Sequence, residues 1–103
     1  MSPVLITSIH VTIRVAPADA PAFLAALKRA HTVVATLPEH VSFELYQHPN
    51  EPGTYKYIEN WNASAAWIMK AAAENEACQE YFCVTEKMYV QPKEMEVWTR
   101  MEG

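Results

Sequence analysis

A short stretch in the middle of the chain gathers residues that could bind and activate a small aromatic molecule. Tyr57, Glu59 and Trp61 alternate along a predicted strand and share one of its faces, because strand side chains repeat every two residues. Trp67 and Lys70 follow three residues apart, which places them on one face of a predicted helix. Such aromatic walls suit a flat phenolic ligand, and an ammonium or a phenol could stabilise its anion.

The predicted site divides into catalytic and binding residues. The catalytic candidates are Tyr57 and Lys70, and the substrate-binding candidates are Trp61, Trp67, Tyr46 and Glu59. Simpler structural interpretations stay open for all of them. The two tryptophans could be packing residues, the lysine an exposed helix charge, and the glutamate the ion-pair partner of Arg14 or of a helix end.

The four histidines are weaker candidates for proton transfer. Histidine is the side chain that usually changes charge near neutral pH, so His10 would be a natural proton carrier. Alternation, however, places His10 on the sheet face opposite to Tyr57, where an interface role is expected. Surface positions are expected for His31, His40 and His48.

Two cysteines, Cys78 and Cys83, are five residues apart. This spacing fits neither a zinc knuckle nor a redox pair, and no histidines cluster around them. We expect reduced, partly buried thiols, no metal site and no cofactor.

Length and composition predict one domain, residues 1–103, half of whose residues are hydrophobic. A chain of this size buries only about 60 to 70 per cent of its unfolded surface. Three Trp, five Tyr and three Phe are more than a compact monomer would hide, which favours self-association.

The charge and hydropathy patterns exclude two classes of partner. The net charge is -4 and no basic run is present, so the positive field that nucleic acids require is missing. No stretch approaches the roughly 20 apolar residues of a membrane span, and the first six residues resemble no leader. The sequence therefore predicts a cytoplasmic protein without nucleic-acid or membrane partners.

The elements that must position these residues follow from hydrophobic periodicity. Alternation over residues 9–15 predicts a strand, and a helix is expected over 20–36 with Asp19 as its cap. Strands over 41–47 and 54–61 are joined by a loop rich in Pro, Asn and Gly, which is typical of a hairpin.

The second half of the chain predicts two helical runs and a last strand. One helix is expected to begin at Asn62 and to fray near Glu74. Apolar residues at helical spacing over 78–89 predict another helix, ended by Pro92. Alternation over 94–101 predicts the fourth strand.

This order of elements is the split β-α-β arrangement of ferredoxin-like folds, an α+β class with a four-stranded antiparallel sheet and helices on one face. The other face would carry His10, Thr12 and Arg14 among aromatic and polar side chains. A second copy of the chain would cover it, so a homodimer is expected.

The element order and several short motifs resemble the antibiotic biosynthesis monooxygenase family of dimeric α+β barrels. The resemblance is carried by SFELY at 42–46, PG at 52–53, ENW at 59–61, and VAP at 15–17 leading into PAFL at 21–24. It spans about Ile6 to Val97. It implies a homodimer in which two sheets face each other.

The resemblance also implies an activity. Family members acting on anthrones and polyketide phenols are cofactor-independent oxygenases of secondary metabolism, and Trp61 and Trp67 match aromatic positions of these members. Tyr57 stands where they carry Asn, and Lys70 stands where many members place His. The haem-degrading branch needs an Asn where this chain has Val11, so haem degradation is disfavoured.

The implied chemistry is physically simple. A deprotonated polyphenol, anthrone or quinol can reduce oxygen directly, so the protein need only remove a proton, stabilise the anion and exclude water. In this hypothesis Lys70 or Tyr57 stabilises the phenolate and a solvent-linked base takes the proton. Two alternatives remain: a non-oxidative cyclase, isomerase or decarboxylase of an enolisable carbonyl compound, and a non-catalytic dimer that binds small molecules.

Overall fold

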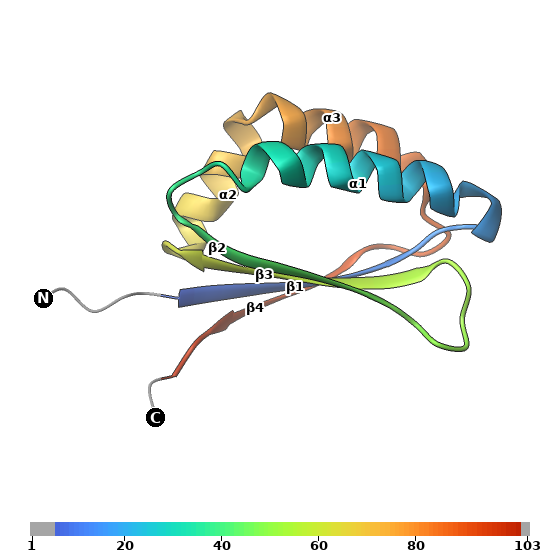
Figure 1. The fold of residues 1–103 in the computed structure, drawn as a ribbon, viewed down its shortest axis with the longest axis horizontal. Helices are drawn as coiled ribbons and strands as arrows, with labels where there is room; N and C mark the ends of the chain where they lie inside the picture. Colours follow the sequence, from blue (N-terminus) through green and yellow to red (C-terminus); the bar gives the residue numbers. More distant parts are fainter. Residues whose placement is uncertain (1–5, 102–103) are drawn as a thin grey trace, which may run out of the picture.

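The computed structural model describes residues 6–101 as one sheet with the helices on a single face (Figure 1). The elements are β1 (Ile6–Arg14), η1 (Pro17–Asp19), α1 (Ala20–Val34), β2 (His40–Gln47), β3 (Thr54–Asn62), α2 (Ala65–Glu74), α3 (Glu76–Thr85), η2 (Glu86–Met88) and β4 (Glu94–Thr99). The predicted order is confirmed. The ends of the predicted domain, 1–5 and 102–103, lie outside the described residues, as does the expectation about a leader.

The sheet is antiparallel throughout, with the strand order β2-β3-β1-β4. β1 lies in the middle, where Val11 pairs with Tyr57 of β3 and with Met95 of β4. Directly paired residues share a face of the sheet, so these three side chains lie under the helices. This confirms the predicted α+β, ferredoxin-like fold. No helix among residues 6–101 is long and apolar enough to cross a bilayer.

The core lies between the sheet and the helices. Its buried hydrophobic members are Ile9, Val11, Ile13, Val15, Phe23, Ala26, Leu27, Ala30, Val34, Tyr55, Tyr57, Trp61, Ile68 and Tyr81. Phe23 of α1 is fully buried, stacks on Tyr55 with 5.5 Å between ring centroids, and contacts Tyr81 of α3 at 6.3 Å. Burying a side chain of this kind stabilises the fold by about 1.5–3 kcal/mol. These aromatic contacts fix α1 and α3 side by side above the sheet (Figure 1).

The helix starts differ from the predictions. Ser64, not Asn62, caps α2 by accepting a hydrogen bond from a backbone N–H of the first turn at 3.1 Å, while Asn62 still belongs to β3. Asp19 precedes α1 but makes no capping hydrogen bond within the described chain, because η1 already leads into the helix. The side chain of Asn75 accepts a hydrogen bond from the Cys78 N–H at 3.1 Å, so α3 begins directly after α2.

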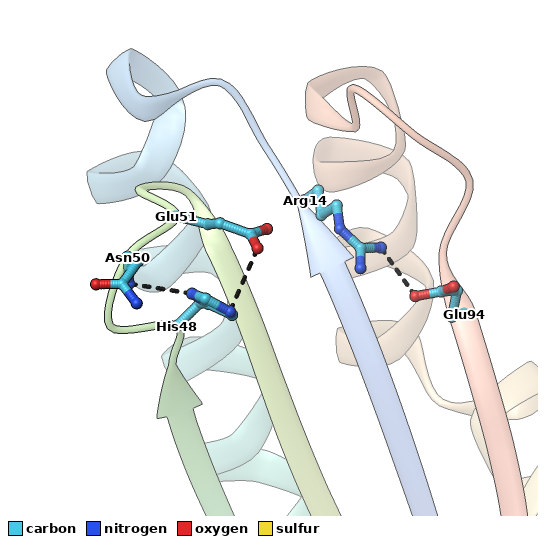
Figure 2. A network of polar contacts seen from close by, with 5 residues as sticks. All are labelled: Arg14, His48, Asn50, Glu51 and Glu94. Atoms are coloured by element: carbon cyan, nitrogen blue, oxygen red, sulfur yellow. Dashed lines mark hydrogen bonds and ion pairs between the residues drawn. The ribbon is translucent and has the colours of Figure 1, made fainter.

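The opposite face of the sheet is covered by no helix in residues 6–101 (Figure 1). By register it carries Ser8, His10, Thr12, Arg14, Ser42, Glu44, Tyr46, Lys56, Ile58, Asn60, Glu94, Glu96 and Trp98. We call this set the bare face. The predicted placement of His10, Thr12 and Arg14 on it is confirmed. Arg14 donates a hydrogen bond to the Glu94 carboxylate at 2.8 Å (Figure 2).

The loop of the β2–β3 hairpin is anchored to the end of β1. His48 lies 3.3 Å from the Glu51 carboxylate, and its Nδ1 accepts a hydrogen bond from the Asn50 N–H at 3.0 Å (Figure 2). Gly53 has a φ of 85°, and its carbonyl accepts a hydrogen bond from the Val15 N–H at 2.9 Å. A Cβ at this position would lie 2.2 Å from the Val15 carbonyl oxygen. The turn therefore requires glycine both for its backbone angle and for space.

Replacing that glycine tests the anchor. We expect Gly53→Ala to lower the free energy of unfolding by about 2 kcal/mol or more, because it combines a strained backbone angle with a backbone collision. Urea unfolding followed by circular dichroism measures the change. The matched control is Asn50→Ala in the same loop, whose effect should stay within about 0.5 kcal/mol. A Gly53→Ala protein with the wild-type unfolding midpoint would contradict this account.

Candidate functional site

A cavity of about 280 Å³ lies between the sheet and the three α-helices. Its lining is mostly apolar. The polar or titratable residues in it are His31, Tyr57, Glu59, Asn75, Cys78, Gln79, Tyr81 and Lys93. A pocket was expected between the second helix and the sheet. The structure widens it, because α1 and α3 also contribute walls.

Glu59 is a partly buried carboxyl on the sheet side of this cavity. One of its oxygens accepts a hydrogen bond from Trp61 Nε1 at 3.0 Å. Burial raises the pKa of Glu59 above its usual value, and the hydrogen bond from Trp61 offsets part of that rise. The suggested ion pair between Glu59 and Arg14 is not formed, since Arg14 binds Glu94 on the bare face. A carboxyl with a raised pKa in an aromatic cavity is suited to exchange protons with a ligand.

Two buried phenols, Tyr57 of β3 and Tyr81 of α3, flank this part of the cavity. Burial is the main cause that raises the pKa of both phenols far above the ordinary value, so both stay protonated hydrogen-bond donors. The Tyr57 ring stacks on Phe43 with 5.6 Å between centroids. The Tyr81 hydroxyl is buried and has no hydrogen-bond partner within the described part of the chain.

Trp61 and Trp67 are in contact, with ring centroids 6.1 Å apart, but only Trp61 lines the cavity. Trp67 is 37% exposed and covers Trp61 from outside, and Lys70 is exposed outside the cavity. The predicted wall of Trp67 and Lys70 is therefore not formed. The reason is the rotation of α2, which turns Ile68 and Ala72 toward the cavity. Lys70 lies two residues from Ile68 and so projects from the opposite side of the helix.

Tyr46 is separated from the other candidates by the sheet. It pairs with Lys56, whereas the preceding residue pairs with Tyr57, so alternation turns Tyr46 to the bare face. Its hydroxyl donates a hydrogen bond to the Glu44 carboxylate, which raises the pKa of Tyr46. The structure thus brings together Tyr57, Glu59 and Trp61 of the six predicted residues.

The surface positions expected for His31 and His40 are wrong. His31 lines the cavity and stacks on Phe43 with 4.2 Å between ring centroids. His40 meets the Trp61 ring edge-on at 5.1 Å, and burial, followed by the proximity of His31, lowers its pKa. His31 follows the buried Leu27 of α1 by four residues, about one helical turn. This spacing could have predicted that His31 lies on the apolar side of the helix.

The two cysteines are free, as expected, but only Cys78 is partly buried; the expectation is wrong for Cys83, which is exposed. Cys78 lines the cavity, and burial raises the pKa of its thiol, which keeps it protonated and weakly nucleophilic. At the cavity edge the Lys93 ammonium lies 4.8 Å from the centre of the Phe82 ring. Across residues 6–101, no three His, Cys, Asp or Glu side chains are grouped so that they could hold a metal ion.

The arrangement combines an apolar enclosure, a carboxyl of raised pKa and two neutral phenols. The carboxylate can accept a proton from a ligand in the cavity. The Tyr57 phenol can donate a hydrogen bond to an oxygen that gains negative charge when the proton leaves. Apolar walls keep water away from the reactive anion and strengthen these interactions.

Comparison with known proteins gives a consistent result. The sequence pattern of the family described as "Antibiotic biosynthesis monooxygenase" matches residues 7–83. "Putative monooxygenase GME11364" of Pestalotiopsis microspora is 28% identical over 96 residues, which cover 93% of this chain and 80% of that protein.

Solved structures share the fold. Two proteins that carry the name "Putative antibiotic biosynthesis monooxygenase" align over nearly their whole length. The one from Nitrosomonas europaea has a TM-score of 0.84 at 13% identity and covers 98% of this chain and 95% of its own. The one from Caulobacter crescentus CB15 has a TM-score of 0.81 at 20% identity, and the alignment covers 95% of this chain and 92% of that protein. With the family pattern matched over most of its length, the chain belongs to the antibiotic biosynthesis monooxygenase family.

Proposed function

We propose that the protein is a cofactor-independent monooxygenase acting on a small aromatic or polyphenolic substrate of the quinol or anthrone type. The observation that carries the proposal is Glu59, a carboxyl of raised pKa that faces an aromatic cavity beside Tyr57. Family membership and a relative named as a monooxygenase support the same reaction class. A role in secondary metabolism, where such phenols arise, is part of this proposal.

Glu59 is the general base in this scheme. Its carboxylate accepts a proton from the ring hydroxyl or from an acidic ring C–H of the substrate. A general base is most effective when its pKa lies near the operating pH, and burial moves the pKa of Glu59 upward in that direction. The hydrogen bond from Trp61 Nε1 holds the carboxylate in place while the proton is transferred.

Tyr57 and Trp61 position and stabilise the substrate anion. Tyr57 remains an O–H donor because burial raises its pKa, so it can hydrogen-bond the oxygen on which negative charge accumulates. The family resemblance implies that an Asn amide is the donor at this position in related enzymes that act on phenols. Tyr57 would take its place here. The Trp61 ring supplies a flat wall at the cavity.

Oxygen reacts directly with the anion. The anion passes an electron to O₂, and the two radicals combine into a substrate peroxide that takes up a proton. Loss of water then leaves a carbonyl, so a CH₂ group and O₂ become C=O and H₂O. The carboxylate, the phenol donor and the exclusion of water are the contributions asked of the protein.

The same base and donors favour a second candidate, a non-oxidative cyclase, isomerase or decarboxylase. Proton removal next to a carbonyl gives an enolate, and a buried carboxylate beside phenol donors would stabilise its formation in the same way. The two candidates differ in their requirement for oxygen. The third possibility, a dimer that only binds small molecules, predicts no turnover with or without oxygen.

We further propose that a second copy of the chain covers the bare face. Trp98 is 57% exposed there although tryptophan is usually buried. It pairs with Ser8 of β1, and Ile58 pairs with His10, two residues further along the same strand. Ser8 and His10, which are 2.9 Å apart at Oγ and Nε2, lie between them. An apolar centre with polar neighbours of this kind fits a symmetric contact between two sheets.

Oxygen uptake tests the main proposal. Metal-free protein with an anthrone or a hydroquinone should consume oxygen faster than protein-free buffer, and Glu59→Gln should lower that rate by about 100-fold through loss of the base. The glutamine retains an oxygen for the Trp61 hydrogen bond. Tyr55→Phe is the matched control, since Tyr55 is as buried as Tyr57 and lies on the same face of β3 outside the cavity lining.

Rates equal to buffer across these substrates, or full activity in Glu59→Gln, would count against the oxygenase. Product formation that continues under strict anaerobiosis would instead support the non-oxidative enzyme.

The raised pKa of Glu59 predicts a pH dependence of stability. The folded protein holds the Glu59 proton more tightly than the unfolded chain, so unfolding becomes easier as the pH rises from 4.5 through the raised value. Glu59→Gln removes this contribution. Urea unfolding should therefore show the variant to be more stable than the wild type at pH 7, with the difference shrinking toward pH 4. Wild-type and Glu59→Gln stability curves that run parallel over this pH range would show that burying the Glu59 carboxylate does not destabilise the fold.

The oligomeric state tests the proposed covering of the bare face. Light scattering should give twice the chain mass for the wild type, and Trp98→Glu should shift it toward the monomer because a charge would be buried at the contact. Val33→Glu changes an apolar residue of α1, 43% exposed on the helical side, and should stay dimeric. A monomeric wild type, or a dimer unaffected by Trp98→Glu, would exclude this arrangement.

A further inference from the structure

The cavity opens to solvent on the side of β4. The lining residues contributed by α1, β1 and β3 are buried or partly buried, whereas the exposed ones come from α2, α3 and residues 93–95. β4 is an edge strand whose six residues are all exposed, so the helices leave this side open. We call the exposed lining residues the mouth of the cavity; they are Met69, Ala73, Gln79, Lys93 and Met95.

Lys93 supplies the positive charge of this mouth. The lining of the cavity within residues 6–101 holds this one lysine and no arginine. The Lys93 ammonium lies 4.8 Å from the centre of the Phe82 ring, which also lines the cavity and contacts the Tyr81 ring with 5.5 Å between centroids. A cation above an aromatic face is attracted to the ring. The ammonium is therefore held at the mouth and does not extend freely into solvent.

No carboxylate of the chain neutralises this ammonium. Lys93 takes part in no ion pair among residues 6–101. The adjacent carboxylate, Glu94, lies on the bare face, where it binds Arg14 at 2.8 Å. Alternation turns Lys93 to the other side of the sheet, together with Met95. The charge at the mouth is thus left for an anion that comes from outside the chain.

We propose that the cavity binds an aromatic ligand that carries a carboxylate, and that the Lys93 ammonium binds this carboxylate at the mouth. The inference rests on the proposed function, because it narrows the substrate of the same cavity to aromatic acids. It makes Lys93 a residue that determines specificity and that stands apart from the proposed base.

The charges at the two ends of the cavity decide which way such a ligand lies. Glu59, on the sheet side, is negative whenever it can act as a base, so it repels a second carboxylate. The chain as a whole, with a net charge of -4, does not attract anions. At the mouth, Lys93 attracts the carboxylate while solvent still hydrates it, which keeps the cost of desolvation small. The ring that loses a proton then faces Glu59.

A carboxylate fits this mouth better than a phosphate does. One ammonium balances one negative charge, whereas phosphate recognition usually takes several donors, such as arginines or the N–H groups of a helix N-terminus. The Gln79 amide, the other polar side chain of the mouth, already donates a hydrogen bond to the Ala72 carbonyl at 3.0 Å. The site is therefore built for a single charge.

A pair of probes isolates the effect of the charge. 2-Naphthoate and 2-naphthamide share one ring skeleton and a planar substituent of similar size, but at pH 7 only the first is charged. Their dissociation constants can be measured by isothermal titration calorimetry. The wild type should prefer the naphthoate, and Lys93→Gln should reduce this preference about fivefold, as expected for an ion pair that water reaches. The affinity for the neutral amide should not change, which shows that the cavity of the variant is intact.

Two further variants separate a local contact from net charge. Lys87→Gln removes the same charge from an exposed residue of η2 outside the cavity lining and should keep the wild-type preference. Lys93→Arg retains the charge and should also keep it. Added salt should weaken the preference of the wild type and leave that of Lys93→Gln nearly unchanged, because ions screen an exposed pair.

The other outcomes are equally decisive. Absence of binding by both probes, a wild type that binds the amide as tightly as the naphthoate, or an equal loss of preference in Lys87→Gln would overturn the inference. Because binding is measured without turnover, a preference that depends on Lys93 in a protein that consumes no oxygen would uphold this site and reject the monooxygenase. Oxygen consumption with neutral phenols and no preference for the acid would do the reverse.

Discussion

The register of β3 is the constraint on which the cavity depends. Alternate residues of this strand, among them Tyr57 and Glu59, face the helices, and a slip by one residue would turn all of them to the bare face. The pairing of Val11 with Tyr57 fixes the register in the middle of the sheet. At its end the contact between Gly53 and Val15 fixes where the strand begins. The position of the proposed base is thus decided by a turn that lies outside the cavity lining.

The polar groups of the cavity oppose the stability of the fold that holds them. A carboxyl near apolar walls loses hydration, which is why the pKa of Glu59 is raised, and the single hydrogen bond from Trp61 replaces only part of the lost water. The Tyr81 hydroxyl, which has no hydrogen-bond partner of ordinary geometry within residues 6–101, adds to this. Aromatic contacts around Phe23 offset these terms elsewhere in the core. Destabilising groups gathered in one cavity are characteristic of sites selected for chemistry.

Strand alternation made much of the site predictable. It correctly assigned Tyr57, Glu59 and Trp61 to the helical side, because the period of two is strong in β1 and β3. The alanine-rich α2 has no comparable apolar stripe. The spacing of Trp67 and Lys70 therefore fixed their relation to each other and left open which side of the helix meets the sheet. The cavity itself arises from tertiary packing, which no local pattern encodes.

The two faces of the sheet are linked through the same strand. Each β3 residue on the floor of the cavity is flanked by residues of the bare face, so Glu59 stands between Ile58 and Asn60. On that face the Asn60 amide donates a hydrogen bond to the Ser42 hydroxyl at 3.0 Å and ties β3 to β2. A second copy packed against the bare face would restrain this strand further without entering the cavity. The proposed contact with a second copy would thereby add to the restraints that the pairing with β1 and the Gly53 turn already place on the register of the base.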